Sequence, residues 1–300
     1  MPNCTTLLLV DVQNDFHPGG SLAIPTANED ADRIAALIRS HPEKIDRIVA
    51  TMDSHQKLHI AHPSFWLAGD GSGLHPVPFT IISHDDIRNG TWKPRPDLKT
   101  CTNDKNTLDR EVLGDLKDVE NESGSFDLTK YCIEYARRLE EKGRFQICIW
   151  PEHCLIGSTG HSLVDSVREA INEWSEQTGR SVEWVMKGQN LLTEMYSALA
   201  AEVPVSHTTA FNHKVHSSLL ESDRLIVCGQ AMSHCVNYTL RDIVEYKPEI
   251  STCQIYLLLD CTSSVPTFEY AANEFQHDME KLGVLLVKST ELFQCASFKK

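Results

Sequence analysis

Short apolar runs alternate along the chain with stretches in which apolar residues recur every three or four positions. The runs are apolar throughout and rich in β-branched residues, which is typical of strands buried on both faces. The stretches between them have helical spacing and carry end signals: Asp127 can cap one helix, and Gly143 and Gly179 follow two predicted helix ends. The pattern predicts an α/β protein in three layers, with a doubly wound, mainly parallel sheet covered by helices on both faces.

The predicted elements cover most of the chain. The strands are expected at residues 7–12, 47–52, 145–150, 182–186, 224–228, 254–259 and 283–287. The helices are expected at residues 28–39, 127–141, 162–177, 234–246 and 268–282. Residues 67–126 break this rhythm because they are rich in Gly, Pro, Asp, Asn and Lys. We expect there an insertion with short strands, best indicated at residues 79–83, within one domain spanning residues 1–300.

Charge and cysteine usage narrow the class of protein. The net charge of −14 disfavours a nucleic-acid partner, because phosphate binding needs a basic face. The apolar run at residues 7–10 is too short for a signal-peptide core or a membrane span, so we expect no membrane partner. The ten cysteines include no C-x-x-C pair, so we expect reduced thiols in a cytoplasmic protein.

The stretch from Gly229 to Val236 places Cys235 where a predicted strand turns into a helix. The helix dipole favours a thiolate at this position, and the turn offers backbone N–H groups close to the sulfur. A nucleophile and an oxyanion hole can be built together in this way. The alternative is a buried structural cysteine, since free Cys is among the most buried residue types.

Polar residues also mark other strand ends, which is where ligands bind in open α/β sheets. Asp11 interrupts a buried strand, so it needs a cationic partner or a proton, and either would suit a general base; a turn cap is the alternative. Lys187 either reaches solvent or pairs with a carboxylate. Trp150 could present a flat face to an aromatic ligand, although a core tryptophan is the ordinary interpretation.

A candidate metal set follows the second predicted strand. Asp53 and His55 are two residues apart, so they point the same way in an extended chain, and His59 follows four residues later. One carboxylate and two imidazoles suit a divalent transition metal. His153 could complete the set, and His62 is close enough to be an alternative ligand. The chain has fourteen histidines, however, so a cluster of this kind can also arise by chance.

Taken in their order along the chain, the motifs resemble those of the isochorismatase-like cysteine hydrolases and, within them, the nicotinamidases. The resemblance spans nearly the whole chain outside the insertion. The matching pieces are residues 10–16, Pro18-Gly19-Gly20-Ser21-Leu22, Asp53-x-His55-x-x-x-His59, Trp150-Pro151-x-His153-Cys154, Lys187-Gly188 and Gly229-x-Ala231-x-x-x-Cys235-Val236.

The resemblance implies roles for these residues. It implies a catalytic triad of Asp11, Lys187 and Cys235. It implies one divalent metal ion with water completing its shell, zinc in first place with manganese or iron as alternatives, and no organic cofactor. The implied metal ligands are Asp53, His55, His59 and His153. A cis peptide between Gln230 and Ala231 would aim the N–H groups of Ala231 and Cys235 into an oxyanion hole, and Phe16, Trp150 and Gln13 would form the substrate pocket.

The implied reaction is hydrolysis of a small carboxamide, either nicotinamide to nicotinate plus ammonia or a related amide. Lys187 and the helix dipole are expected to lower the pKa of Cys235, and Asp11 to accept the thiol proton. The thiolate would attack the carbonyl, and water would hydrolyse the resulting thioester. The metal is expected to orient the substrate.

Some residues depart from the family pattern. Gln230 stands where an aliphatic residue is usual, residues 157–161 differ from the usual Gly-Thr-x-Gly-Ala, and Glu194 is the nearest match to an acidic residue before Ser-Tyr-Ser. One alternative is a cysteine amidohydrolase for a carbamoyl or ureido compound, although such relatives generally lack the metal set. Another is a catalytically silent metal-binding scaffold. The role of the insertion, assembly into a homo-oligomer, and metal binding by His62 or His84 stay open.

Overall fold

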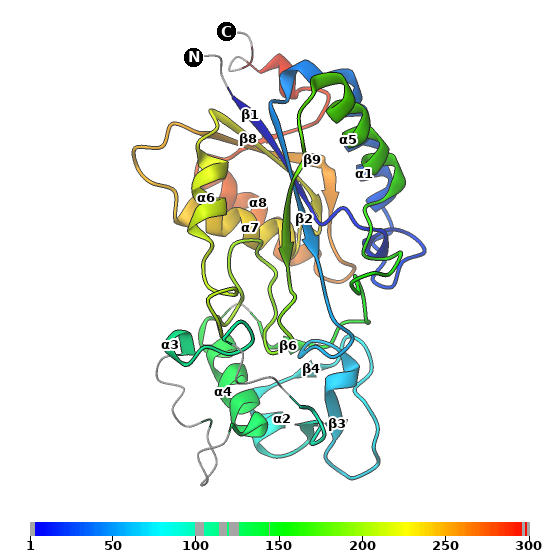
Figure 1. The fold of residues 1–300 in the computed structure, drawn as a ribbon, viewed down its shortest axis with the longest axis vertical. Coiled ribbons are helices and arrows are strands. Elements are labelled where there is room, and N and C mark those ends of the chain that lie inside the picture. Colours follow the sequence, from blue (N-terminus) through cyan, green and yellow to red (C-terminus); the bar gives the residue numbers. More distant parts are fainter. Residues whose placement is uncertain are drawn as a thin grey trace.

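A computed structural model describes residues 4–99, 105–113, 119, 126–143, 145–295 and 298. Its main sheet has six strands in the order β10-β9-β8-β1-β2-β7, and every pairing is parallel (Figure 1). The strands are β1 (Thr5–Val10), β2 (Arg47–Asp53), β7 (Glu183–Lys187), β8 (Arg224–Gln230), β9 (Gln254–Ser263) and β10 (Leu285–Val287). Among the described residues, no helix has the length and apolar character needed to cross a membrane.

Helices cover both faces of this sheet, as the hydrophobic pattern predicts (Figure 1). Leu7 and Leu9 of β1 belong to one core cluster, whereas Leu8 and Val10 belong to the other, because successive strand side chains point to opposite faces. The first cluster packs under α1 (Ala27–Ser40) and α5 (Asp165–Thr178), and the second under α6 (His213–Leu220), α7 (Cys235–Glu245) and α8 (Glu269–Lys281). The three-layer doubly wound architecture is therefore confirmed.

The predicted strand at residues 145–150 is wrong as a member of the main sheet. Only β6 (Ile147–Cys148) forms there, and it pairs antiparallel with β4 (Ile81–Ile82), which lies within the short strand expected at residues 79–83. The backbone N–H groups of Ile149 and Trp150 donate to Thr80 and Ala61 rather than to a main-sheet strand. Apolar composition alone could not distinguish these two destinations. Helix α6 was not predicted, and Asn212 caps its start.

A small body lies beyond the carboxyl ends of the main strands, in the lower part of Figure 1. It contains β3 (Trp66–Ala68), β5 (Trp92–Pro94), α2 (His84–Arg88), α3 (Arg110–Leu113) and α4 (Leu128–Glu141). Trp66, Tyr131 and Tyr135 are buried in its own core cluster. Helix α4, which Asp127 caps as predicted, therefore packs in this body and not on the main sheet. Residues 100–104, 114–118 and 120–125 of the expected insertion lie outside the described residues.

Candidate active site

The four polar positions singled out at strand ends meet at one edge of the sheet. Asp11 directly follows β1, Asp53 ends β2, Lys187 ends β7 and Cys235 begins α7 just after β8. Asp53 and Lys187 are register partners on neighbouring strands. Because all of these strands are parallel, their carboxyl ends come together, and this edge faces the small body (Figure 1).

Lys187 is the centre of the charged part of this edge. Its Nζ lies 2.9 Å from Asp11 Oδ2, 3.0 Å from Asp53 Oδ1 and 3.5 Å from Cys235 Sγ. The residue is 2% exposed, so the interpretation that it reaches solvent is wrong. Burial alone would lower the pKa of Lys187, but the carboxylates of Asp11 and Asp53 outweigh burial and hold that pKa well above its usual value. Lys187 is therefore a buried, protonated ammonium.

Asp11 is held in place by the neighbouring strand. The Thr51 hydroxyl donates to Asp11 Oδ1 at 2.5 Å, and Thr51 Oγ1 accepts from the Asp11 backbone N–H at 3.1 Å. The Asp11 backbone has a φ of 45°, in the left-handed region. Burial raises the pKa of the fully buried Asp11 carboxyl, while Lys187 opposes that rise. A carboxylate positioned in this way suits proton exchange with a neighbouring group.

Cys235 is a buried thiol beside this pair. Burial raises the pKa of the thiol well above its ordinary value; Lys187 lowers it, and a hydrogen bond to Asp11 raises it further. The expectation that the pKa would be lowered is therefore wrong in its net direction, because burial outweighs the ammonium. The site therefore places a thiol beside a carboxyl group that could accept its proton.

The turn before Cys235 has the shape that the resemblance implies. The peptide bond between Gln230 and Ala231 is cis, and the Ala231 carbonyl accepts from His234 N at 3.0 Å and Val236 N at 3.1 Å. Gly229 has a φ of 117°, and a Cβ atom there would lie 2.0 Å from the Val10 carbonyl oxygen, so the turn requires glycine.

The Gln230 side chain points away from the thiol. Its Nε2 donates to Asp30 Oδ2 of α1 at 2.9 Å, and its Oε1 accepts from Ser263 N at 3.2 Å. The departure from the aliphatic residue of the family is thus matched by a polar partner in the neighbouring helix.

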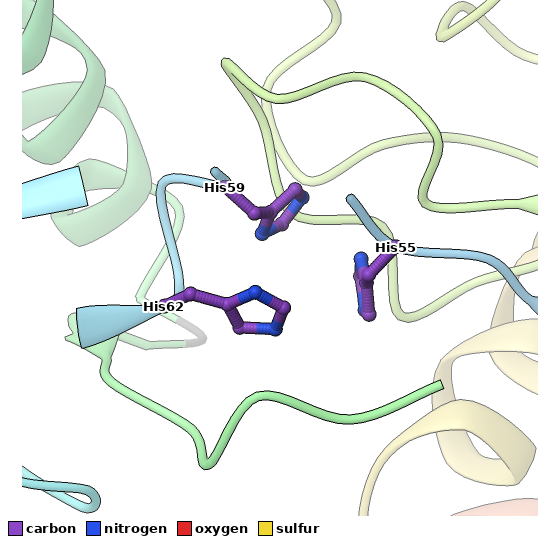
Figure 2. Close-up of side chains that lie close together, drawn as sticks. All are labelled: His55, His59 and His62. Carbon is purple, nitrogen blue, oxygen red and sulfur yellow. The ribbon is translucent and has the colours of Figure 1, made fainter. Parts of the chain in front are cut away.

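Histidines occupy the other half of the site. Two groups have ligand atoms close enough for one metal ion: Asp53 with His55 and His153, and His55 with His59 and His62. Figure 2 shows the rings of the second group facing a common space. The predicted set of four ligands is therefore divided between two groups that share His55. His84, left open as a ligand, lies on α2 beside Asp85 at 3.3 Å and is in neither group.

The chemistry of these side chains fits a divalent cation. His55 Nε2 and His153 Nε2 lie 3.1 and 3.4 Å from Asp53 Oδ2. His55 Nδ1 donates to the Gly188 carbonyl at 3.0 Å, so Nε2 is the nitrogen that faces the carboxylate. Burial alone would lower the pKa of His55, but the Asp53 carboxylate outweighs burial and raises that pKa, just as it would attract a cation. Burial lowers the pKa of His62 to about 3, and that of His59 falls well below its usual value, so both rings are neutral, as ligation requires.

A cavity opens between the thiol and the histidines. Phe16 and Trp150 line it as predicted, and Trp150 Nε1 donates to the Tyr196 hydroxyl at 3.0 Å. The full lining is Phe16, Leu22, Asp53, Trp150, His153, Glu194, Tyr196, Ala231, His234, Cys235 and Val265. Gln13 is not among these residues. Its Nε2 donates to the Asp53 carbonyl at 2.8 Å and its Oε1 accepts from the Asp53 N–H at 2.7 Å, so Gln13 fixes the backbone of Asp53.

Glu194 lines the cavity, although no role is predicted for it from the sequence. It is 6% exposed; its Oε1 accepts from Met195 N at 2.8 Å, and its buried Oε2 has no hydrogen-bond partner among the described residues. Burial raises the pKa of this carboxyl, which His55 opposes. The sequence signal for Glu194 is its place shortly before Tyr196-Ser197, where it matches the family's acidic residue only imperfectly.

Comparison with known proteins agrees with this arrangement, although no protein-family model matches the chain. The chain is 23% identical over 285 residues to the nicotinamidase of Saccharomyces cerevisiae, covering 94% of this chain and 98% of that protein. It is 23% identical over 250 residues to the nicotinamidase of Escherichia coli, covering 82% and 80%.

Two solved structures share the fold at low identity. A nicotinamidase/pyrazinamidase of Acinetobacter baumanii aligns with a TM-score of 0.58 and 21% identity, over 97% of this chain and 99% of that chain. A pyrazinamidase of Pyrococcus horikoshii in complex with zinc aligns with a TM-score of 0.51 and 18% identity, over 95% and 98%.

The parallel main sheet, with Cys235 at its carboxyl edge, is the fold that these solved structures share. Sequence likeness to curated nicotinamidases runs along nearly the whole chain. The chain is therefore similar to nicotinamidases in both sequence and fold.

Proposed function

We propose that this protein hydrolyses nicotinamide, or a closely related small aromatic carboxamide, to the acid and ammonia. The observation that carries the proposal is the buried Lys187 ammonium, which contacts both Asp11 and the Cys235 sulfur at the wall of an aromatic cavity. Phe16 and Trp150 give that cavity flat apolar faces suited to a ring. The activity of the curated relatives supports this choice of substrate.

The residues divide the chemistry between them. Asp11 takes the proton of the Cys235 thiol as the sulfur attacks the carboxamide carbon. Lys187 stabilises the carboxylate of Asp11 and the thiolate that forms at Cys235. The N–H groups of Ala231 and Cys235 hold the oxyanion. Asp11 then gives the proton to the departing nitrogen, the C–N bond breaks and ammonia leaves. Asp11 next accepts a proton from water, which cleaves the thioester and releases the acid, and the proton returns to the sulfur.

Asp53, His55 and His153 would hold a divalent metal ion, for which zinc is proposed because a neighbour of the same fold was solved with zinc. When bound, the ion supplies a Lewis-acidic anchor for a ring heteroatom. The residues around it supply the rest of the recognition: the ring lies between Phe16 and Trp150, and the carboxamide is directed toward Cys235.

Ammonia release from a panel of amides by the metal-loaded protein tests this proposal. Nicotinamide should be the better substrate and benzamide, which has the same shape without the ring nitrogen, should have a kcat/KM at least about 10-fold lower. A carbamoyl or ureido compound should release no ammonia. If the protein hydrolysed the ureido compound and did not hydrolyse nicotinamide, the substrate assignment would be wrong, and the proposed amidohydrolase class would stand.

A further inference from the structure

We propose that His62 is a metal ligand of this protein and that His59 is not. The inference rests on the proposed metal centre and refines it for this chain. The ligand atoms of Asp53, His55 and His153 already lie close together, and His62, which shares a close group with His55, would move toward them to complete the shell.

His62 has a free nitrogen aimed at the centre. The residue is fully buried, and its Nδ1 lies 3.2 Å from the Lys57 carbonyl oxygen, which can accept only from an N–H. The proton is therefore on Nδ1, and the lone pair is on Nε2. That Nε2 is buried with no hydrogen-bond partner among the described residues, a rare state for a buried polar atom. A cation would satisfy it.

The same pattern recurs in the other two histidines of the centre. His55 Nδ1 is bonded to the Gly188 carbonyl at 3.0 Å, and His153 Nδ1 to the Pro151 carbonyl at 2.8 Å. In both rings the second nitrogen, Nε2, lies close to Asp53 Oδ2, at 3.1 and 3.4 Å. A backbone carbonyl that fixes one nitrogen and leaves the other for the metal is the usual outer support of a ligating histidine. His62 therefore shares the arrangement of two residues already in the centre.

His59 differs because both of its nitrogens are engaged. Its Nε2 lies 3.1 Å from the Thr193 carbonyl oxygen, which places the proton on Nε2. Its Nδ1 accepts from the Ala61 backbone N–H at 3.2 Å. To bind a cation through Nδ1, His59 would have to leave that buried N–H without a partner, which is unfavourable.

Ring positions point the same way. The His62 ring lies 5.1 Å from the His55 ring and 5.5 Å from the His153 ring, measured between centroids. The His59 ring lies 4.4 Å from that of His55, but no ring contact joins it to His153 within the described part of the chain. His62 thus lies beside the His55 ring, which Figure 2 also shows, and beside the His153 ring.

His62 also connects the centre to the small body. It directly precedes the short 3-10 helix η3 (Pro63–Phe65), and Phe65 and Trp66 are buried in the core of that body. An ion bound by His62 would fasten the small body to the end of β2, where Asp53 lies.

Proton NMR of the cobalt(II)-substituted protein tests the assignment without reference to activity. Each ligating imidazole gives one exchangeable, hyperfine-shifted N–H signal, and the bonds to Gly188, Lys57 and Pro151 protect these protons from exchange. We expect three such signals from the Cys235→Ala protein, two after His62→Gln and still three after His59→Gln. Three signals after His62→Gln, or the loss of one after His59→Gln, would overturn the proposal.

Metal affinity provides a second readout. It is needed in case a variant changes the NMR spectrum because it misfolds. In zinc competition with a chromophoric chelator, His62→Gln should weaken binding by at least about 100-fold and His59→Gln by less than about 10-fold. Equal losses in the two variants would contradict the assignment. If the wild type bound neither ion, the metal centre and this inference would both fail, whereas ammonia release would still report separately on cysteine-dependent hydrolysis.

Discussion

The two halves of the site satisfy their buried polar groups in different ways. Around Lys187, two carboxylates and a thiol surround one ammonium, and each charge has a partner within the protein. Around His55, several imidazoles surround one carboxylate, and two ring nitrogens have no hydrogen-bond partner among the described residues. The first half is complete as a proton-transfer device, whereas the second is complete only with a cation. In the proposed function, this difference separates the groups that would react from the groups that would hold the substrate.

The largest effect on stability should come from breaking the charged half. Lys187→Met would leave Asp11 and Asp53 buried without their cation, so we expect a loss of roughly 3–5 kcal/mol in unfolding free energy, measured by urea denaturation. The matched control is Lys57→Met, whose exposed ammonium lies 3.5 Å from Glu152; it should change stability by less than about 1 kcal/mol. Similar effects of the two substitutions would mean that the buried ion pairs are not as described.

Metal removal addresses the histidine half. Dialysis against a strong chelator should abolish ammonia release and leave the main sheet folded, because that sheet has two apolar core clusters of its own. Hydrogen exchange should become faster at residues 57–66, which join His62 to the small body, and stay slow in β1 and β8. Global unfolding on chelation would show that the metal is structural.

A smaller, pH-dependent effect should come from His234 in the cavity wall. Burial among Trp150, Tyr196 and Phe268 lowers the pKa of His234 to about 3, so the unfolded chain binds the extra proton as the pH falls through about 6.5. Its contribution to stability is complete above that pH and is lost progressively down to about pH 3.

The matched comparison is between wild type and His234→Phe. From pH 7.5 to pH 5, the wild type should lose about 2 kcal/mol more unfolding free energy than the variant. Parallel pH profiles of stability for the two proteins would contradict the burial of a neutral ring at this position.

An effect of similar size concerns the turn before Cys235. Gln230→Leu would leave the buried Asp30 oxygen and the Ser263 N–H without a partner, and we expect a loss of about 1–3 kcal/mol. Adding Asp30→Leu should recover part of that loss, because replacing both partners is nearly neutral. Strictly additive losses in thermal denaturation would show that the two side chains do not interact.

The sequence was sufficient for the main fold because β1, β2 and β8 are apolar on both faces and the helices between them keep a regular spacing. It was not sufficient for residues 145–150, whose apolar run is equally compatible with either sheet. The core of the small body could not be predicted from the sequence either, because it joins residues as far apart as Ile60 and Val205.

The candidate site shows the same limit. Strand ends and motif spacing indicated Asp11, Lys187 and Cys235, and the structure brings them together. Spacing could not separate His59 from His62, because the distinction lies in the bonds that Ala61, Thr193 and Lys57 make to the two rings. Nor could it show that burial would outweigh Lys187 in setting the pKa of Cys235.

The most direct test of the account is ammonia release from nicotinamide by three metal-loaded proteins: wild type, Cys235→Ala and Cys228→Ala. Cys228 is a second buried cysteine, on β8, whose side chain packs in the opposite core cluster. We predict a loss of at least about 10⁴-fold in kcat for Cys235→Ala and a change of only a few-fold for Cys228→Ala. Comparable rates in wild type and Cys235→Ala would contradict the assignment of Cys235 as the nucleophile.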